Sequence, residues 1–130
     1  MTDMTHSQEN DQDQERHIFV VFTNSKDGQD DAFNSWYDQH HVREIVALDG
    51  FVSGQRYELH PEQRPGQVGP PWRYLAIYEI RGDVPKLHQL LKERSATFVK
   101  SSALKNDHVA WVYSHRGELV DHNGGPGAEA

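Results

Sequence analysis

The nine residues WYDQHHVRE, from Trp36 to Glu44, bring together side chains that can move protons. Tyr37 and His41 are four residues apart and His41 and Glu44 are three apart, so on one helix these side chains can touch. An imidazole beside a carboxylate and a phenol suits general acid–base catalysis. The carboxylate can orient the ring, and the phenol can donate to a developing oxyanion. We therefore take His41, Glu44 and Tyr37 as the candidate catalytic residues.

A helical wheel places this cluster on the apolar face of its helix. At about 100° per residue, with Phe33 at zero, Glu44 lies at about 20°, Tyr37 at about 40° and His41 at about 80°. His40 lies on the other side of that stripe, and an error of one residue in the phase would favour it over His41. Burial on this face would move pKa values toward neutrality. A buried cluster of this kind can equally be structural, with its polar groups bonded only to one another and to strand ends.

The elements that must position the cluster follow from apolar patterning. Gly50 is suited to end the first helix in the left-handed conformation, and Pro85 is tolerated in the first turn of the second. Residues 60–71 hold four prolines and two glycines, which predicts a long surface connection. Periodicity and composition predict strands at 17–24, 51–59, 72–80 and 108–115, and helices at 31–48 and 84–99.

This order predicts an α+β protein with the ferredoxin-like β-α-β-β-α-β arrangement, in which two helices cover one face of a four-stranded antiparallel sheet. Nothing in the order covers the other face. The first, third and fourth strands nevertheless carry apolar residues on both sides. Because such a face must be buried somewhere, we expect a homodimer through the sheet faces.

The 130 residues suit one domain. Residues 1–16 are polar and acidic and cannot bury enough surface to offset ordering entropy, so they are expected to be a disordered tail. Residues 116–130 contain Gly-Gly-Pro-Gly and are expected to form a flexible C-terminal tail. The folded domain is therefore predicted over 17–115.

Composition excludes several function classes. The net charge of −7 and the scattered basic residues disfavour binding to nucleic acid. No apolar run reaches membrane-spanning length and no secretory signal is recognisable, so we expect no membrane association and a cytoplasmic location. The absence of cysteine excludes disulfides and thiolate chemistry. A small apolar or aromatic metabolite and a second copy of the chain are the expected partners.

One segment resembles a known family. Residues 33–59, FNSWYDQHHVREIVALDGFVSGQRYEL, resemble the dimeric α+β barrel superfamily, in particular EthD-like small bacterial proteins, whose pattern is close to W-Y-D-x-x-H-x-P-E followed by P-G-F-V-x-x-x-R. Arg43 and Asp49 stand where prolines are usual in that pattern. The matching residues are Trp36, Tyr37, Asp38, His41, Glu44, Gly50, Phe51, Val52 and Arg56.

The resemblance implies a ferredoxin-like protomer, a sheet-to-sheet dimer, a pocket between helices and sheet, and His41 as the acid/base group. It does not decide the reaction, because the superfamily includes cofactor-free monooxygenases, polyketide cyclases, muconolactone isomerase and haem-using enzymes.

Our first hypothesis is a cofactor-independent isomerase, lyase, dehydratase or cyclase acting on a small, largely apolar carbonyl or phenolic metabolite. Arg56 could hold an anionic or carbonyl oxygen, or be an exposed strand charge. The residues expected to bind the substrate are Phe33, Trp36, His40, Arg56 and Tyr74.

Two alternatives stay open: a non-catalytic binding or accessory protein, and a cofactor-free monooxygenase or haem-binding relative. No metal and no cofactor are expected. His40 and His41 diverge by about 100° on a helix and so do not readily share one ion, and no H-E-x-x-H pattern is present.

Overall fold

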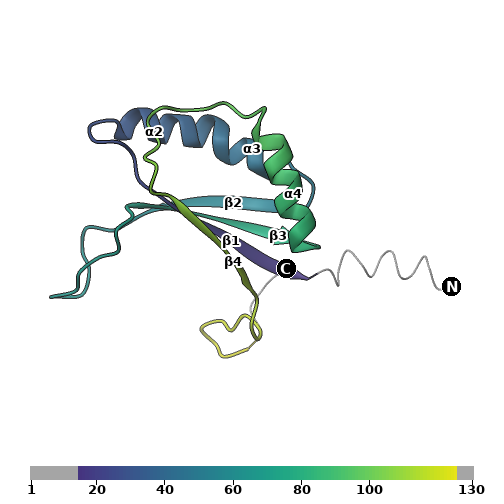
Figure 1. The fold of residues 1–130 in the computed structure, drawn as a ribbon. Coiled ribbons are helices and arrows are strands. Elements are labelled where there is room, and N and C mark those ends of the chain that lie inside the picture. The colour runs from purple at the N-terminus through teal and green to yellow at the C-terminus, as the bar shows by residue number, and fades with distance from the viewer. Residues whose placement is uncertain (1–14, 126–130) are drawn as a thin grey trace.

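The computed structural model describes residues 15–125, and its element order confirms the predicted α+β ferredoxin-like fold (Figure 1). Helices α2, η1 and α3 follow one another without a break and form one continuous helix. The elements are β1 (Arg16–Thr23), α2 (Asp30–Trp36), η1 (Tyr37–His41), α3 (Val42–Val46), β2 (Phe51–Glu58), β3 (Tyr74–Arg81), α4 (Val84–Ser95) and β4 (Val109–Ser114).

The predicted tails lie partly outside the described residues. Of the N-terminal tail predicted over 1–16, residues 1–14 lie outside, and β1 already begins at Arg16. Of the C-terminal tail predicted over 116–130, residues 126–130 lie outside. None of the helices within residues 15–125 combines the length and the apolar character that crossing a membrane requires.

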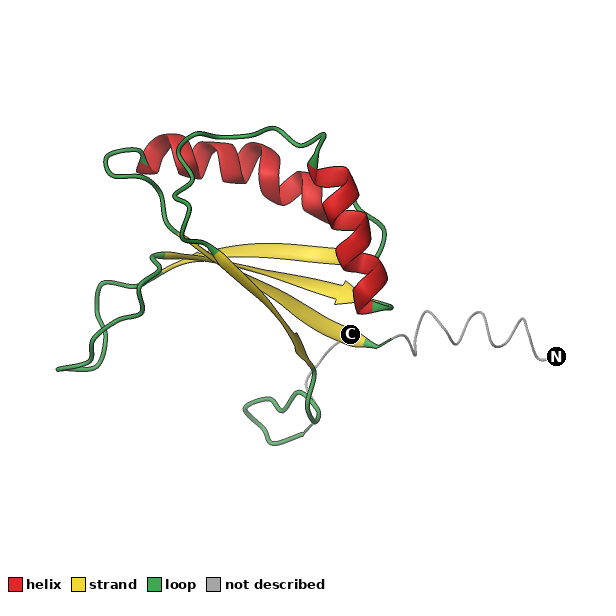
Figure 2. Ribbon diagram, in the orientation of Figure 1, coloured by secondary structure: helices red, strands yellow, loops and turns green. Residues whose placement is uncertain are grey.

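The four strands form one antiparallel sheet in the order β2-β3-β1-β4. Both helical segments lie on the same face of this sheet (Figure 2). In the register, Phe19 at the middle of β1 lies opposite Tyr78 of β3 and Val112 of β4. These three side chains therefore point toward the helices, as residues in register on neighbouring strands share a face.

The core lies between this face and the helices. On β3 every second residue is buried, the alternation expected of a strand with one covered face. The continuous helix contributes Phe33 and Tyr37, whose rings contact each other edge to face at 5.7 Å. Burying each of these side chains stabilises the fold by about 2–3 kcal/mol. The fully buried large side chains are Tyr37, Tyr78, Phe33 and Ile80.

The opposite face of the sheet is uncovered in the protomer and largely apolar. By the register, it carries Ile18, Val20 and Phe22 at the centre of the sheet. On the edge strand β4, Trp111 and Tyr113 share this face and are 57% and 55% exposed. The predicted two-sided apolar sheet is therefore present.

Helix α4 ends at Ser95 and is therefore four residues shorter than the predicted helix 84–99. The side-chain hydroxyl of Ser95 donates to the carbonyl of Lys92 at 2.8 Å, and that of Thr97 to the carbonyl of Arg94 at 2.8 Å. Such hydroxyl bonds compete with the helical backbone pattern. Phe98, which the apolar spacing assigned to this helix, therefore lies in the connection that follows.

The first helix ends at Val46, before the predicted 48, and its C-cap residue Ala47 keeps a right-handed conformation. Gly50, predicted to end this helix, lies instead in the turn that leads to β2, with a φ of 90°. A Cβ at this position would overlap with Leu87 Cδ2 and would lie 3.1 Å from the carbonyl oxygen of Arg81. Glycine is therefore needed both for the backbone conformation and for the close approach of α4.

Candidate functional site

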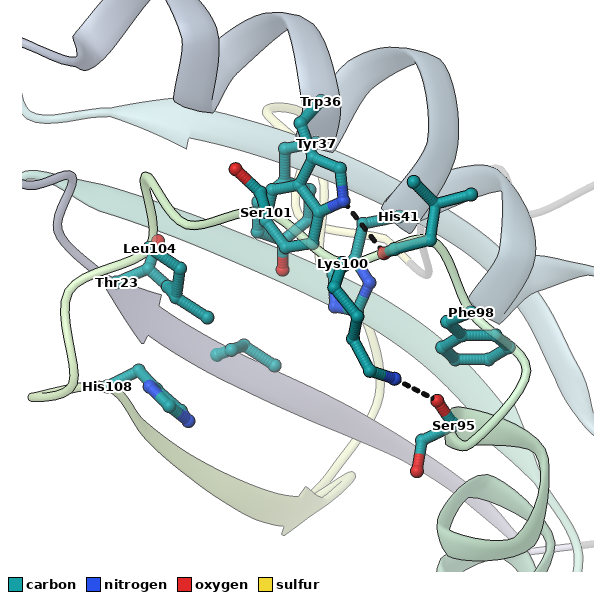
Figure 3. Close-up of a pocket in the computed structure, with 12 residues that line it drawn as sticks. Thr23, Trp36, Tyr37, His41, Ser95, Phe98, Lys100, Ser101, Leu104 and His108 are labelled. Carbon is teal, nitrogen blue, oxygen red and sulfur yellow. Dashed lines mark hydrogen bonds between the residues drawn. The ribbon is translucent and has the colours of Figure 1, made fainter.

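A cavity of about 360 Å³ lies between the continuous helix, the sheet and the connection from α4 to β4. We call this connection, residues 96–108, the strap. Figure 1 shows the strap running along the helix before it descends to β4. Figure 3 shows the side chains that surround the cavity. They are Val21, Thr23, Trp36, Tyr37, His41, Ser95, Phe98, Val99, Lys100, Ser101, Leu104 and His108.

A π-helical turn places two of the predicted catalytic residues, since η1 begins at Tyr37 and ends at His41. The backbone N–H of Val42 donates to the carbonyl of Tyr37, five residues back. The guanidinium Nε of Arg43 donates to the Asp38 carbonyl at 3.0 Å and so supports this turn. The wider turn holds one more residue than an α-helical turn, and such turns are frequent at functional sites.

The π turn also corrects the predicted helix face. The wheel placed Glu44 at the centre of the apolar stripe, but an extra residue in the turn rotates the following segment by about 100°. Ile45 is consequently the buried residue of α3, at 3% exposure, and Glu44 is only partly buried. His41 lines the cavity and His40 is exposed.

The His41 ring is held by three aromatic side chains. It stacks on Trp36 with ring centroids 4.7 Å apart and an interplanar angle of 20°. Tyr37 and Phe98 contact it edge to face, at 4.9 Å and 5.9 Å. Packing on three sides fixes the orientation of the imidazole without a hydrogen bond.

Burial lowers the pKa of His41 to about 4, which is away from neutrality and not toward it as expected, and the Glu44 carboxylate opposes this shift only in part. The positive charges of Lys100, His108 and Arg56 add to the lowering. The ring is therefore neutral at pH 7 and can accept a proton. Its Nδ1 is buried and has no hydrogen-bond partner within residues 15–125, which leaves Nε2 as the nitrogen that a ligand can reach.

Glu44 contacts the strap. Its Oε2 accepts a hydrogen bond from the backbone N–H of Val99 at 3.1 Å, and the Trp36 indole N–H donates to the Val99 carbonyl at 2.9 Å. Two side chains of the helix thus bind both backbone groups of one strap residue. Glu44 Oε1 is buried without a partner in the described part of the chain. The carboxylate therefore holds the strap, which forms one wall of the cavity, at Val99. It acts on His41 through its charge.

Tyr37 is buried at 1% exposure, and its hydroxyl accepts a long hydrogen bond of 3.4 Å from Tyr78. Burial raises the pKa of Tyr37, the hydrogen bond from Tyr78 opposes this, and the charge of Arg56 opposes it as well. The phenol therefore stays protonated and keeps a hydrogen that it can donate.

Four of the residues predicted to bind substrate do not line the cavity. Phe33 lies in the core, and His40 points outward. Arg56 lies over the ring of Tyr37 at 4.4 Å and donates to Asp38 Oδ1 and Asn34 Oδ1, both at 2.9 Å, so it joins β2 to the helix. Tyr74 donates to Asp30 Oδ2 at 2.6 Å outside this cavity. Trp36 is the fifth residue of this group and does line it.

Sequence reasoning missed the residues that the strap contributes. Phe98, Lys100, Ser101 and His108 line the cavity. The backbone N–H of Lys26 donates to the carbonyl of Ala103 at 2.8 Å, and this hydrogen bond anchors the strap to the connection between β1 and α2. A connection of this length without regular structure is typical of functional loops, but the helix predicted to residue 99 hid most of it.

Within residues 15–125 no group of three or more His, Cys, Asp or Glu side chains could hold a metal ion. His40 and His41 point in different directions, as their helical spacing predicted.

The buried imidazole makes the stability of the fold depend on pH. Between pH 6.5, the ordinary pKa of His41, and about 4, its pKa in the fold, the unfolded chain binds more protons than the folded chain. The free energy of unfolding should therefore fall as the pH is lowered through this range, by at most about 3 kcal/mol. The free energy of unfolding of His41→Gln, measured by urea denaturation at each pH, should lack the part of this decrease that comes from His41. Parallel pH profiles of the two proteins would contradict a buried neutral imidazole.

No protein-family model matches the chain, and no curated protein matches its sequence. Among solved structures it is similar to a "putative monooxygenase" from Shewanella loihica PV-4, at 12% identity and a TM-score of 0.55, over 77% of this chain and 93% of that one. HapK from Hahella chejuensis aligns at 13% identity and a TM-score of 0.44, over 73% of this chain and 90% of that one. At these identities the likeness concerns the fold alone. The chain thus has the α+β fold found in protomers of dimeric α+β barrel proteins.

Proposed function

We propose that the protein is an acid–base enzyme that needs no cofactor and acts on a small, largely apolar carbonyl or phenolic metabolite. The observation that carries this proposal is a neutral, immobilised His41 at the wall of an apolar cavity. The matched residues of the W-Y-D-x-x-H-x-x-E motif support a relationship to EthD-like proteins. Isomerisation, dehydration and aldol-type cyclisation all begin with the proton transfer that such a site can perform.

In this mechanism Nε2 of His41 takes a proton from the carbon next to a carbonyl, or from a phenol. The electron pair left behind moves onto the oxygen, and the Tyr37 hydroxyl donates a hydrogen bond to it. Because the pKa of His41 is about 4, its imidazolium is more acidic than that of an ordinary histidine and returns the proton readily to another position of the substrate. Glu44 stabilises the imidazolium by its charge and holds the strap at Val99.

The test is deuterium exchange at acidic carbons in D₂O, followed by NMR on a panel of aryl ketones and hydroxyaryl ketones. The wild-type protein should catalyse exchange above the rate in buffer alone. Tight binding of a panel member without exchange or turnover would instead favour a non-catalytic binding or accessory protein.

A cofactor-free monooxygenase is the second candidate, and the fold likeness to the Shewanella protein favours it. The first step would be the same, since a phenolate or enolate formed by His41 can react with molecular oxygen. Oxygen consumption that depends on the substrate would select this alternative over isomerisation or cyclisation.

We also propose that two copies of the chain pair through the uncovered sheet face. Trp111→Glu places a charge on the exposed apolar part of that face, so it should convert a dimer into a monomer in light scattering after gel filtration. Val68→Glu is the control, because Val68 is 90% exposed in the connection between β2 and β3. A wild-type monomer, or a dimer unaffected by Trp111→Glu, would refute this pairing.

A further inference from the structure

The cavity has a polar edge that the proposed proton transfer does not use. Lys100 lines it, with its ammonium group donating to the carbonyl of Ser95 at 2.5 Å (Figure 3). Ser101 follows on the strap, and its hydroxyl oxygen accepts from the Ala103 N–H at 3.0 Å. The hydroxyl hydrogen of Ser101 and two of the three ammonium hydrogens of Lys100 are therefore left for a ligand.

Polar groups on two sides of the cavity act on His41. Lys100 and His108 both lower the pKa of His41 through their charges. Figure 3 shows His108 across the cavity from Lys100 and Phe98. Of the carboxylates that the structure describes, none lies within ion-pair distance of Lys100 or His108. Glu44, the acid next to His41, uses one oxygen for Val99.

The rest of the lining is apolar. Trp36, Phe98 and Leu104 offer flat or branched hydrocarbon surfaces. A ligand that fits both parts has an apolar body and one anionic group at its end. A carboxylate suits this end, since its two oxygens can accept from an ammonium group and a hydroxyl group together.

We propose that Lys100 and Ser101, with His108 on the opposite side, form a carboxylate-binding subsite, so that the substrate is a small aromatic or apolar carboxylic acid. The proposal deepens the proposed function, on which it rests, by naming the substrate class of the same cavity. A carboxylate held at this edge would place the apolar body of the ligand against Trp36 and Phe98, within reach of His41.

Equilibrium binding of 2-naphthoate and its neutral counterpart 2-naphthamide tests the subsite. Both can be followed by calorimetry on the full chain at pH 7 and low ionic strength. Lys100→Met keeps the apolar stem and removes the charge. It should weaken naphthoate binding about fivefold, the effect of one partly exposed ion pair, and leave naphthamide binding unchanged. Lys105→Met is the matched control, because Lys105 lies on the same strap but does not line the cavity.

The outcomes distinguish a Lys100 that binds the carboxylate from one that only packs. An equal loss for both probes would mean that Lys100 only shapes the cavity, and would overturn the proposal. No change in Lys100→Met, an equal loss in Lys105→Met, or no binding of naphthoate to the wild-type protein would overturn it too. The loss for naphthoate should also shrink as salt is added, because added ions screen the pair.

The test also distinguishes this proposal from the proposed function, because it measures binding without turnover. Naphthoate binding that depends on Lys100, in a protein without His41-dependent exchange, would keep the subsite and refute the enzyme. Exchange that depends on His41, with binding insensitive to Lys100, would keep the enzyme and refute the subsite.

Discussion

His41→Gln should lower the rate of catalysed proton exchange by about 10²-fold to 10⁴-fold, the usual contribution of a positioned general base. Glutamine occupies a similar volume and keeps a polar end, but it cannot accept a proton at neutral pH. The loss should appear in kcat more than in KM, because the imidazole acts on the transferred proton and the aromatic wall still binds the ligand. Exchange kinetics by NMR measure both constants.

The pH dependence of the wild-type rate gives an independent check. A base with a pKa of about 4 is protonated below that pH and free above it. The value of kcat/KM should therefore rise as the pH increases through about 4 and stay level toward neutrality. His40→Gln is the matched control, because the adjacent imidazole is exposed and lies outside the cavity. Retained activity in His41→Gln, or an equal loss in His40→Gln, would contradict the role of His41.

Gly50→Ala should destabilise the fold by about 3–4 kcal/mol, measured as the free energy of unfolding in urea. The φ of 90° costs an alanine about 1 kcal/mol or more. The added Cβ would also overlap with Leu87 Cδ2 and lie 3.1 Å from the Arg81 carbonyl oxygen, which forces α4 or the end of β3 to move. Overpacking of this kind costs a further 1–3 kcal/mol, by the usual rough range.

Two other glycines separate these contributions. Gly28 has a φ of 76°, and a Cβ added there would meet nothing within 4 Å, so Gly28→Ala should show the backbone cost alone, about 1 kcal/mol. Gly54 lacks a positive φ, but a Cβ there would lie 2.8 Å from the ring of Tyr78 and 3.0 Å from Val42, so Gly54→Ala should show the packing cost alone. If Gly50→Ala cost no more than Gly28→Ala, the contact with Leu87 would not be tight.

The strands and the left-handed glycine at Gly50 could be predicted because their causes are local. The alternation along β3 records which side chains face the helices, and the turn between α3 and β2 needs a residue such as Gly50 that adopts a positive φ. The fold class follows from the order of such elements. The predicted cluster of Tyr37, His41 and Glu44 was also local, since these residues share one helix.

The helical phase could not be predicted past Tyr37, because the wheel assumed about 100° for every residue. The π turn runs from Tyr37 to His41, and no sequence pattern predicts it. Its extra residue moves Ile45 rather than Glu44 into the core. The wheel thus placed on the cavity side the imidazole that does line the cavity, His41, and assigned the wrong surroundings to Glu44.

By itself, the sequence determined the ferredoxin-like fold, the two-sided apolar sheet and the helix that carries His41. Only the tertiary structure decided what faces that imidazole. Glu44 binds Val99 across a separation of 55 residues, and Lys100 and His108 reach the cavity from the strap. The physical reason is that backbone periodicity repeats along the chain and can be recognised there, whereas a contact between distant segments depends on how whole elements pack and leaves no local pattern.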